Sequence, residues 1–143
     1  GQMLQKLDMA RQLSLCRHYG IRLDALEQVS LKLLHSKTGA AVARDKFGVS
    51  EEIYNAIFYH TTGKADMTLL EKIIYLADYI EPSRRFPGVD ELRRAVHTDL
   101  NEGLYWALLD SVKELQGYGS PVHPHTREAL DSIRSEIGGT IHE

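Results

Sequence analysis

Apolar residues recur along this chain at intervals of three and four, a spacing that places them on one face of an α-helix. The first such run extends from Leu4 to Cys16 and stops at Gly20, a residue type that readily adopts the left-handed conformation at a helix C-terminus. No segment alternates apolar and polar residues in the manner of a half-buried strand. The pattern therefore predicts an all-α protein.

Start and stop signals delimit the helices that follow. A periodic run from Leu33 to Phe47 ends at Gly48. Ser50 then offers an N-cap hydroxyl ahead of two glutamates, which favour the positive end of the helix dipole, and the apolar pattern continues to Phe58. Two consecutive helices are therefore predicted over residues 33–58.

A capping box opens the next predicted helix. The Thr68 hydroxyl can accept from the amide three residues later, while the Glu71 side chain can reach back to the cap amide. Pro82 would clash with a continuing turn, so this helix is expected to run up to it. Three more helices are predicted over residues 89–96, 100–115 and 124–137.

Composition and charge narrow the class of protein. The 143 residues are 43% hydrophobic, enough to bury a core, and we predict a single helical domain over residues 1–143. A formal net charge of −3 argues against a protein that holds nucleic acid by neutralising its phosphates.

No apolar run approaches the ~20 residues of a spanning helix. The one cysteine, Cys16, has no base beside it and is interpreted as a buried, inert thiol. Together these features predict a cytoplasmic protein with no membrane partner.

Asp78 is the most informative polar residue. The segment from Ile73 to Ile80 is apolar on nearly every side, which is typical of a buried helix, and Asp78 lies within it. An unpaired buried carboxylate is too costly to persist. We therefore expect Asp78 to meet a metal ion, an arginine or backbone donors, or else to be protonated.

Two histidines are candidate ligands. His60 is followed by Thr61, Thr62 and Gly63, so an imidazole stands beside two hydroxyls and a flexible residue, a combination that suits contact with phosphate or metal. His60 fits a C-terminal helix cap favoured by the helix dipole equally well. His35 fits either a ligand or a partly exposed core histidine.

The order of these residues carries more information than any one of them. His35, His60 and Asp78 fall on three successive predicted helices, which is how metal sites are assembled in all-α hydrolases. Three ligands are few for a hydrolytic metal that also holds substrate and water. The three residues therefore predict part of a metal site.

Two further segments are candidates for phosphate contact. Arg84 and Arg85 stand in a predicted loop, where arginine can bind phosphate with both of its terminal nitrogens but can also stay solvated. Residues 121–126 combine two imidazoles, a hydroxyl and a predicted helix N-terminus, which suits an anion or nucleotide. Arg93 and Arg94 are interpreted as part of a solvated helix face.

Several stretches carry a specific family resemblance. The sequence YHTTG at 59–63 and the run DMTLLEKIIYLADYIEP at 66–82 resemble the YqeK family of bacterial HD-domain phosphohydrolases. The similarity continues through Arg84 and FPGV at 86–89, and LLHSKTGA at 33–40 looks like the His-containing helix of that family. The resemblance covers residues 12–131.

The resemblance implies an all-α HD fold that binds iron or a related divalent ion and hydrolyses diadenosine tetraphosphate symmetrically to two ADP. It implies that Asp78 is the final metal-ligating aspartate of the HD pattern, and that His35 and His60 are the intermediate histidines facing the metal and the phosphates. These three are the candidate catalytic and metal-binding residues. The implied nucleotide-binding set adds Thr61, Arg84, Pro121, Val122, His123, Pro124, His125 and Thr126.

The chain departs from the family pattern at its start. The family begins with a histidine in an earlier helix and then the His-Asp pair, and this chain contains no His-Asp dipeptide. Asp8 lies in a Leu-Asp-Met-Ala-Arg run that resembles the pair with Leu for His, but the residues after it match a later part of the family. We therefore interpret Asp8 as a decoy and expect the pair on helices that precede this chain.

Two other functions stay open. The HD fold hosts several phosphate chemistries, so the protein could be a nucleotide monophosphatase or a cyclic-nucleotide phosphodiesterase, and its partner could be an ADP-like nucleotide. An HD module without its His-Asp pair could also bind nucleotide without chemistry. Tyr105 and Trp106 fit either the core or a homodimer face, and we interpret them as core.

Overall fold

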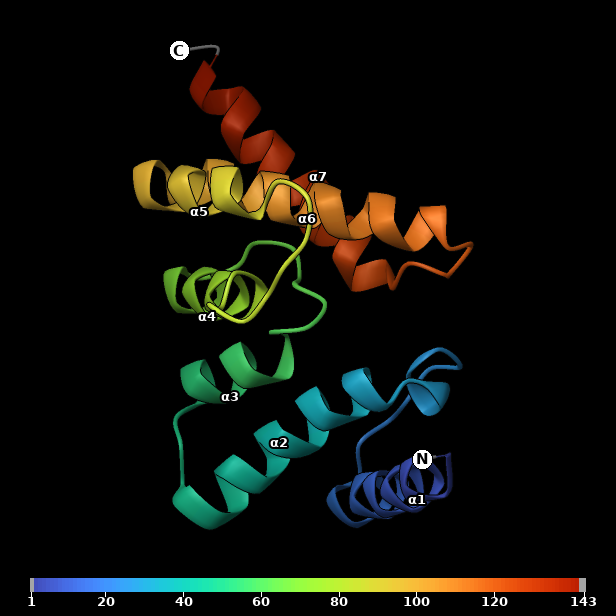
Figure 1. Cartoon of the computed structure of the whole chain (residues 1–143). Coiled ribbons are helices and arrows are strands. Elements are labelled where there is room, and N and C mark those ends of the chain that lie inside the picture. Colours follow the sequence, from blue (N-terminus) through green and yellow to red (C-terminus); the bar gives the residue numbers. More distant parts are fainter. Residues whose placement is uncertain (1, 142–143) are drawn as a thin grey trace. The chain divides into compact units, whose positions relative to one another are not determined.

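The computed structural model of the chain describes residues 2–141 and is helical throughout, with no strand among those residues (Figure 1). The all-α prediction is therefore confirmed. The elements are α1 (Gln2–Tyr19), the 3-10 helix η1 (Glu27–Val29), α2 (Leu31–Phe47), α3 (Glu51–Phe58), α4 (Leu69–Tyr79), α5 (Val89–Thr98), α6 (Leu100–Gly117) and α7 (Pro124–Ile141).

The helix termini follow the predicted chemistry. Gly20 and Gly48, which follow α1 and α2, have φ angles of 67° and 61°, the left-handed conformation in which glycine replaces any other residue without strain. Both halves of the capping box at the start of α4 form: the Glu71 amide donates to the Thr68 hydroxyl at 3.2 Å, and the Thr68 amide donates to the Glu71 carboxylate at 2.8 Å. Ser50 caps α3 as predicted.

Two boundaries differ from the prediction. The helix α4 ends at Tyr79, short of Pro82, because the proline ring disfavours helical backbone at the residue before it as well as removing an amide donor. The helix α2 begins at Leu31 rather than Leu33, because the Ser30 hydroxyl accepts a hydrogen bond from the Leu33 amide and caps the helix earlier than the apolar pattern suggests.

The described chain forms two compact units that meet in sequence between Thr61 and Thr62. In the first unit, α2 packs against α1, η1 and α3. A buried ion pair between Lys37 of α2 and Glu27 of η1 joins two of these elements. The Lys37 ammonium also lies 5.0 Å from the centre of the Phe58 ring, so one lysine links η1, α2 and the end of α3.

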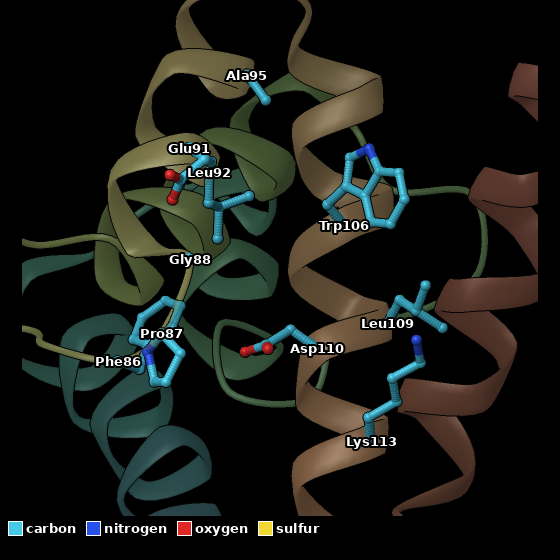
Figure 2. A pocket seen from close by; sticks show the side chains of 10 residues that line it. All are labelled: Phe86, Pro87, Gly88, Glu91, Leu92, Ala95, Trp106, Leu109, Asp110 and Lys113. Atoms are coloured by element: carbon cyan, nitrogen blue, oxygen red, sulfur yellow. The ribbon is translucent and has the colours of Figure 1, made fainter.

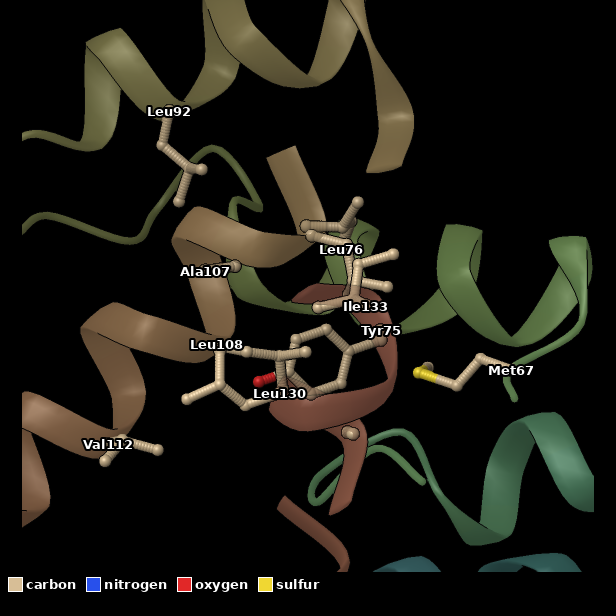
Figure 3. Packing of buried hydrophobic residues seen from close by; sticks show 11 residues of the cluster. Met67, Tyr75, Leu76, Leu92, Ala107, Leu108, Val112, Leu130 and Ile133 are labelled. Carbon is tan, nitrogen blue, oxygen red and sulfur yellow. The ribbon is translucent and has the colours of Figure 1, made fainter. Parts of the chain in front are cut away.

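The second unit has the larger apolar core, which surrounds α6 (Figure 3). The helix α6 contacts α4, α5 and α7, and its Leu104 and Leu108 are fully buried together with Leu76 of α4. Between α5 and α6 the backbones approach closely at Gly103: a Cβ on this residue would lie 2.6 Å from Cγ2 and 2.9 Å from Cα of Val96. Gly103 is therefore required by packing.

The interpretation of Trp106 as a core residue is wrong. Its side chain is 49% exposed, because it lines a surface pocket between α6 and the start of α5, whereas the neighbouring Tyr105 packs partly against the core. No helix within residues 2–141 is both long and apolar enough to cross a membrane.

Candidate functional site

His60 lies in the turn directly after α3, and its ring has a defined orientation. Its Nδ1 is 2.6 Å from the carbonyl oxygen of Ile57 in the last turn of that helix. A carbonyl oxygen only accepts, so Nδ1 carries a proton, and in the neutral ring Nε2 keeps its lone pair. The helix-cap interpretation and the ligand interpretation are thus compatible, because the same bond that caps α3 prepares the other nitrogen to bind a metal.

His35 projects from α2 into solvent, with 52% of its side chain exposed, so it is not a core histidine. Its Nε2 lies 3.1 Å from Oδ2 of Asp8 on α1. Asp8, interpreted from the sequence as a decoy for the His-Asp pair, is therefore the carboxylate partner of a candidate site histidine. The carboxylate favours a proton on Nε2 of His35, which leaves Nδ1 as the nitrogen that can accept or ligate.

A hydroxyl contact connects the two segments that carry these histidines. The Ser36 and Thr61 hydroxyl oxygens lie within hydrogen-bond distance of each other, and each residue directly follows one of the histidines. Ser36 is buried, so α2 is fixed against the turn after α3 at this point. Within the first unit, the structure therefore brings together the backbone at His35 and the backbone at His60.

Asp78 belongs to the second unit, and the expectation that it is buried is wrong. Its side chain is 40% exposed, and Ile73 on the same helix is 44% exposed. The helix α4 buries only the face that carries Glu71, Tyr75 and Leu76, so its other apolar residues stay at the surface of this chain. Asp78 does have the expected type of partner, since its Oδ2 lies 3.4 Å from Nη2 of Arg84.

Arg93 was interpreted as part of a solvated face, and this is wrong as well. Only 22% of its side chain is exposed, and its guanidinium donates to three carbonyl oxygens of the segment after α4. The distances are 3.2 Å to Ile80, 3.0 Å to Glu81 and 3.0 Å to Arg84. Arg93 therefore holds the segment that carries Arg84, while Arg94 is 70% exposed as expected.

Glu81 adds a second carboxylate next to Arg84. The Arg84 Nε lies 4.0 Å from a Glu81 carboxylate oxygen. The pKa of the Glu81 carboxyl is held below its ordinary value, chiefly because the Ser83 hydroxyl and then the Ser83 amide donate hydrogen bonds to it. Arg84 is thus held between two carboxylates on the exposed side of the segment.

The segment of residues 121–126 is organised by its own side chains. His123 is buried, and its Nδ1 accepts a hydrogen bond of 3.0 Å from the amide of His125, so it acts as the N-cap of α7. The two imidazoles stack, with their centres 5.0 Å apart. Thr126 donates its hydroxyl proton to the Thr62 carbonyl at 2.8 Å, and Val122 packs against the core.

The donor set of the candidate residues fits a divalent transition metal. His60 presents a lone pair on a ring already oriented by a carbonyl, and His35 has a carboxylate partner behind its ring. Imidazole nitrogens, and carboxylate oxygens such as those that Asp78 offers in the second unit, are ligand types that zinc, iron and their neighbours bind in proteins. The residues do not distinguish among those metals.

Comparison with known proteins shows the family of the chain. The family described as HD domain matches residues 16–83. A crystal structure described as a predicted HD superfamily hydrolase involved in NAD metabolism, from Clostridium acetobutylicum, superposes with a TM-score of 0.83. It is 40% identical, over 90% of this chain and 68% of that one. The chain therefore belongs to the HD-domain superfamily.

Two curated relatives share the description "Bis(5'-nucleosyl)-tetraphosphatase, symmetrical". The one from Bacillus subtilis is 48% identical over 96 residues, which are 66% of this chain and 52% of that protein. The one from Halalkalibacterium halodurans is 45% identical over 106 residues, which are 73% of this chain and 57% of that protein. The chain thus spans little more than half the length of these relatives.

Proposed function

We propose that this protein is a metal-dependent phosphohydrolase that cleaves diadenosine tetraphosphate symmetrically to two ADP. The similarity to the two symmetrical tetraphosphatases supports this substrate. The observation that carries the chemical part of the proposal is the His60 ring, whose Nδ1–H···O=C bond to Ile57 reserves Nε2 for a ligand. A histidine held in this way is prepared to bind a metal without further rearrangement.

In this proposal His35, His60 and Asp78 hold a divalent ion, with iron as the first candidate. When bound there, such an ion would polarise a phosphoryl oxygen and lower the pKa of a bound water. The carboxylate of Asp8 keeps the His35 ring oriented, and the Arg84 guanidinium orients Asp78.

The nucleotide would be held by groups that donate hydrogen bonds or carry positive charge. Arg84 is the candidate for the polyphosphate, because its fork of donors matches phosphate oxygens and it lies half-exposed beside Asp78. Thr61 offers a hydroxyl next to His60. The backbone of residues 121–126 offers the N-terminus of α7, which favours an anion, and the nucleotide contacts proposed for this segment comprise Pro121, Val122, His123, Pro124, His125 and Thr126.

The decisive experiment is product analysis. Incubation with diadenosine tetraphosphate in the presence of Fe²⁺, Mn²⁺ or Zn²⁺ should yield ADP alone, whereas asymmetric cleavage would release ATP and AMP. The reaction should stop on chelation and return on adding the metal. His60→Gln should reduce metal content and turnover together, because glutamine cannot present an oriented imidazole nitrogen. Release of ATP, or turnover unaffected by both chelator and His60→Gln, would contradict the proposal.

A second candidate substrate has a specific observation behind it. The solved Clostridium acetobutylicum relative is described by its involvement in NAD metabolism. A pyridine mononucleotide, a purine mononucleotide and a cyclic dinucleotide should therefore be assayed in parallel. Preferential turnover of one of these would assign another HD phosphohydrolase activity, and nucleotide binding without any turnover would favour an inert module.

A further inference from the structure

A pocket that contains none of the candidate site residues lies between α6 and the start of α5 (Figure 2). It has a volume of about 310 Å³, at the lower end of the range for small-molecule sites. Its walls are mostly apolar, with Phe86 and Leu92 on one side and Leu109 on the other. Its charged groups come from three residues, Glu91 at the start of α5 and Asp110 and Lys113 on α6.

Trp106 forms an aromatic wall of this pocket. Its indole projects from α6 (Figure 2), lines the pocket and remains half exposed, so a large π-surface is left in contact with water. The Tyr105 ring meets it edge to face at 5.3 Å and restricts its movement. An exposed and supported indole favours stacking with a planar ring, because stacking covers apolar surface without requiring a particular hydrogen bond.

Asp110 places a fixed acceptor beside this wall. Its Oδ2 accepts a hydrogen bond of 2.5 Å from the Tyr79 hydroxyl. The Tyr79 ring is itself held between Tyr75, stacked at 6.0 Å, and Phe86, edge to face at 5.5 Å. Within the described residues Asp110 makes no other hydrogen bond, so its carboxylate has acceptor capacity directed to the pocket (Figure 2).

Lys113 supplies a positive charge one helical turn further along α6. It is exposed, and the structure shows no ion pair for it among residues 2–141. Figure 2 shows its side chain extending along α6 toward Leu109, at the edge of the pocket. An aromatic wall, an acceptor and a cation therefore follow one another along a single helix at residues 106, 110 and 113.

We propose that this pocket binds an amino-purine nucleotide of the adenine type. The base stacks on Trp106, its exocyclic amino group donates to the Asp110 carboxylate, and its phosphate lies on Lys113. The choice of adenine among amino-purines rests on the proposed function, which would supply ADP as product. The acceptor at Asp110 sets the selectivity, since a purine without the amino group leaves the carboxylate without its donor.

Trp106 is the only tryptophan in the chain, so its fluorescence reports this pocket directly. Titration with AMP, excited where adenine does not absorb, should quench the emission. Purine riboside monophosphate differs from AMP only by the missing amino group and should bind roughly tenfold more weakly, the effect of one charge-assisted hydrogen bond. Equal affinities, or no response to AMP at millimolar concentration, would overturn the proposal.

Two variants test the polar partners of the ligand. Each is judged by the ratio of two ligand affinities measured on the same variant, because a general loss of stability affects both affinities equally. In Asp110→Asn the Tyr79 hydroxyl should donate to the amide oxygen, which leaves the amide N–H groups facing the pocket. These groups cannot accept from the amino group of the base, so the affinity ratio of AMP to purine riboside monophosphate should fall to about one. In Lys113→Met the preference for AMP over adenosine should fall. Lys46→Met removes an exposed lysine from the end of α2 and should change neither ratio.

The fluorescence titration tests this pocket independently of the proposed hydrolase activity, because Trp106 emission requires neither metal nor turnover. Quenching with the expected ratios supports the pocket even if diadenosine tetraphosphate is not cleaved. Cleavage without any response of Trp106 overturns the pocket and leaves the hydrolase intact. A change in Trp106 emission that depends on protein concentration and not on AMP would assign the surface to a second copy of the chain, and so also overturns the proposal.

Discussion

The guanidinium of Arg93 on α5 donates a hydrogen bond of 3.0 Å to the backbone carbonyl of Arg84, the arginine whose side chain reaches Asp78. The same guanidinium binds the carbonyls of Ile80 and Glu81. The segment after α4 has no regular secondary structure of its own, so its carbonyls depend on partners from elsewhere. One side chain from α5 thus fixes the backbone from which Arg84 acts.

Replacing Arg93 should therefore affect both stability and substrate binding. Arg93→Ala leaves three carbonyls without their donor and is expected to lower the free energy of unfolding by about 1–3 kcal/mol, measured by urea denaturation. In Arg93→Ala the KM for the polyphosphate should rise more than kcat falls, since Arg84 loses its position. Arg93→Lys should restore only part of the stability and of the KM, because a lysine cannot reach three carbonyls. Arg94→Ala, at an exposed position, is the control and should stay within about 0.5 kcal/mol. A KM that matches wild type would disprove the positioning role.

Asp78 and Arg84 should give different kinetic signatures. Asp78→Ala is expected to remove bound metal and turnover together, because it deletes a proposed ligand. Arg84→Ala should keep the metal and mainly raise KM, because it deletes a phosphate-binding cation. Metal content by elemental analysis and steady-state kinetics separate the two effects. Asp131→Asn, at an exposed carboxylate on α7, provides the control, and unchanged metal content in Asp78→Ala would exclude Asp78 as a ligand.

Gly103 should not tolerate a side chain. A methyl group at this position would lie 2.6 Å from Cγ2 of Val96, so Gly103→Ala must push α5 and α6 apart. We expect a loss of about 1–3 kcal/mol in unfolding free energy, although alanine has the higher helix propensity. Gly39→Ala is the matched control in the interior of α2, where the nearest atom of another residue would be 3.8 Å away, and it should be stabilising by up to about 1 kcal/mol. Thermal denaturation of both variants tests the difference, and equal stability would show that the helices can adjust.

Cys16 should react slowly with alkylating reagents while the protein is folded. Burial raises the pKa of its thiol above the ordinary value, and the side chain is 2% exposed, so both the thiolate fraction and access are reduced. Because the pKa is higher in the folded state than in the unfolded one, ionisation of the unfolded thiol weakens folding only above about pH 8.5. Iodoacetamide labelling followed by mass spectrometry should be slow at pH 8 and fast in denaturant. The chain has one cysteine, so a single mass shift gives the answer.

Much of the local structure could be predicted because local rules fix it. The capping box at Thr68 and Glu71 forms as expected, since both partners lie within one helical turn. Gly20 and Gly48 end their helices for the same kind of reason, as the left-handed backbone is a property of the residue itself. The YHTTG and ADYIEP stretches also placed the chain in the correct superfamily, which the HD-domain match confirms.

Burial and pairing could not be predicted in the same way, since they depend on which distant elements meet. The apolar pattern around Asp78 suggested a buried helix, yet only one face of α4 packs on α6. Arg93 resembled a surface residue because its three carbonyl partners lie nine to thirteen positions away along the chain. Trp106 resembled a core residue because periodicity does not show which flank of α6 remains uncovered.

The sequence by itself determined the helices, their caps and the superfamily, because each is written in neighbouring residues or in a contiguous motif. The tertiary structure alone decided that Asp8 is the partner of His35, that Arg93 supports Arg84, and that Asp110 stands fixed beside an exposed Trp106. The physical reason is that a side chain's solvation and hydrogen-bond partners are set by the packing of helices that are distant in sequence.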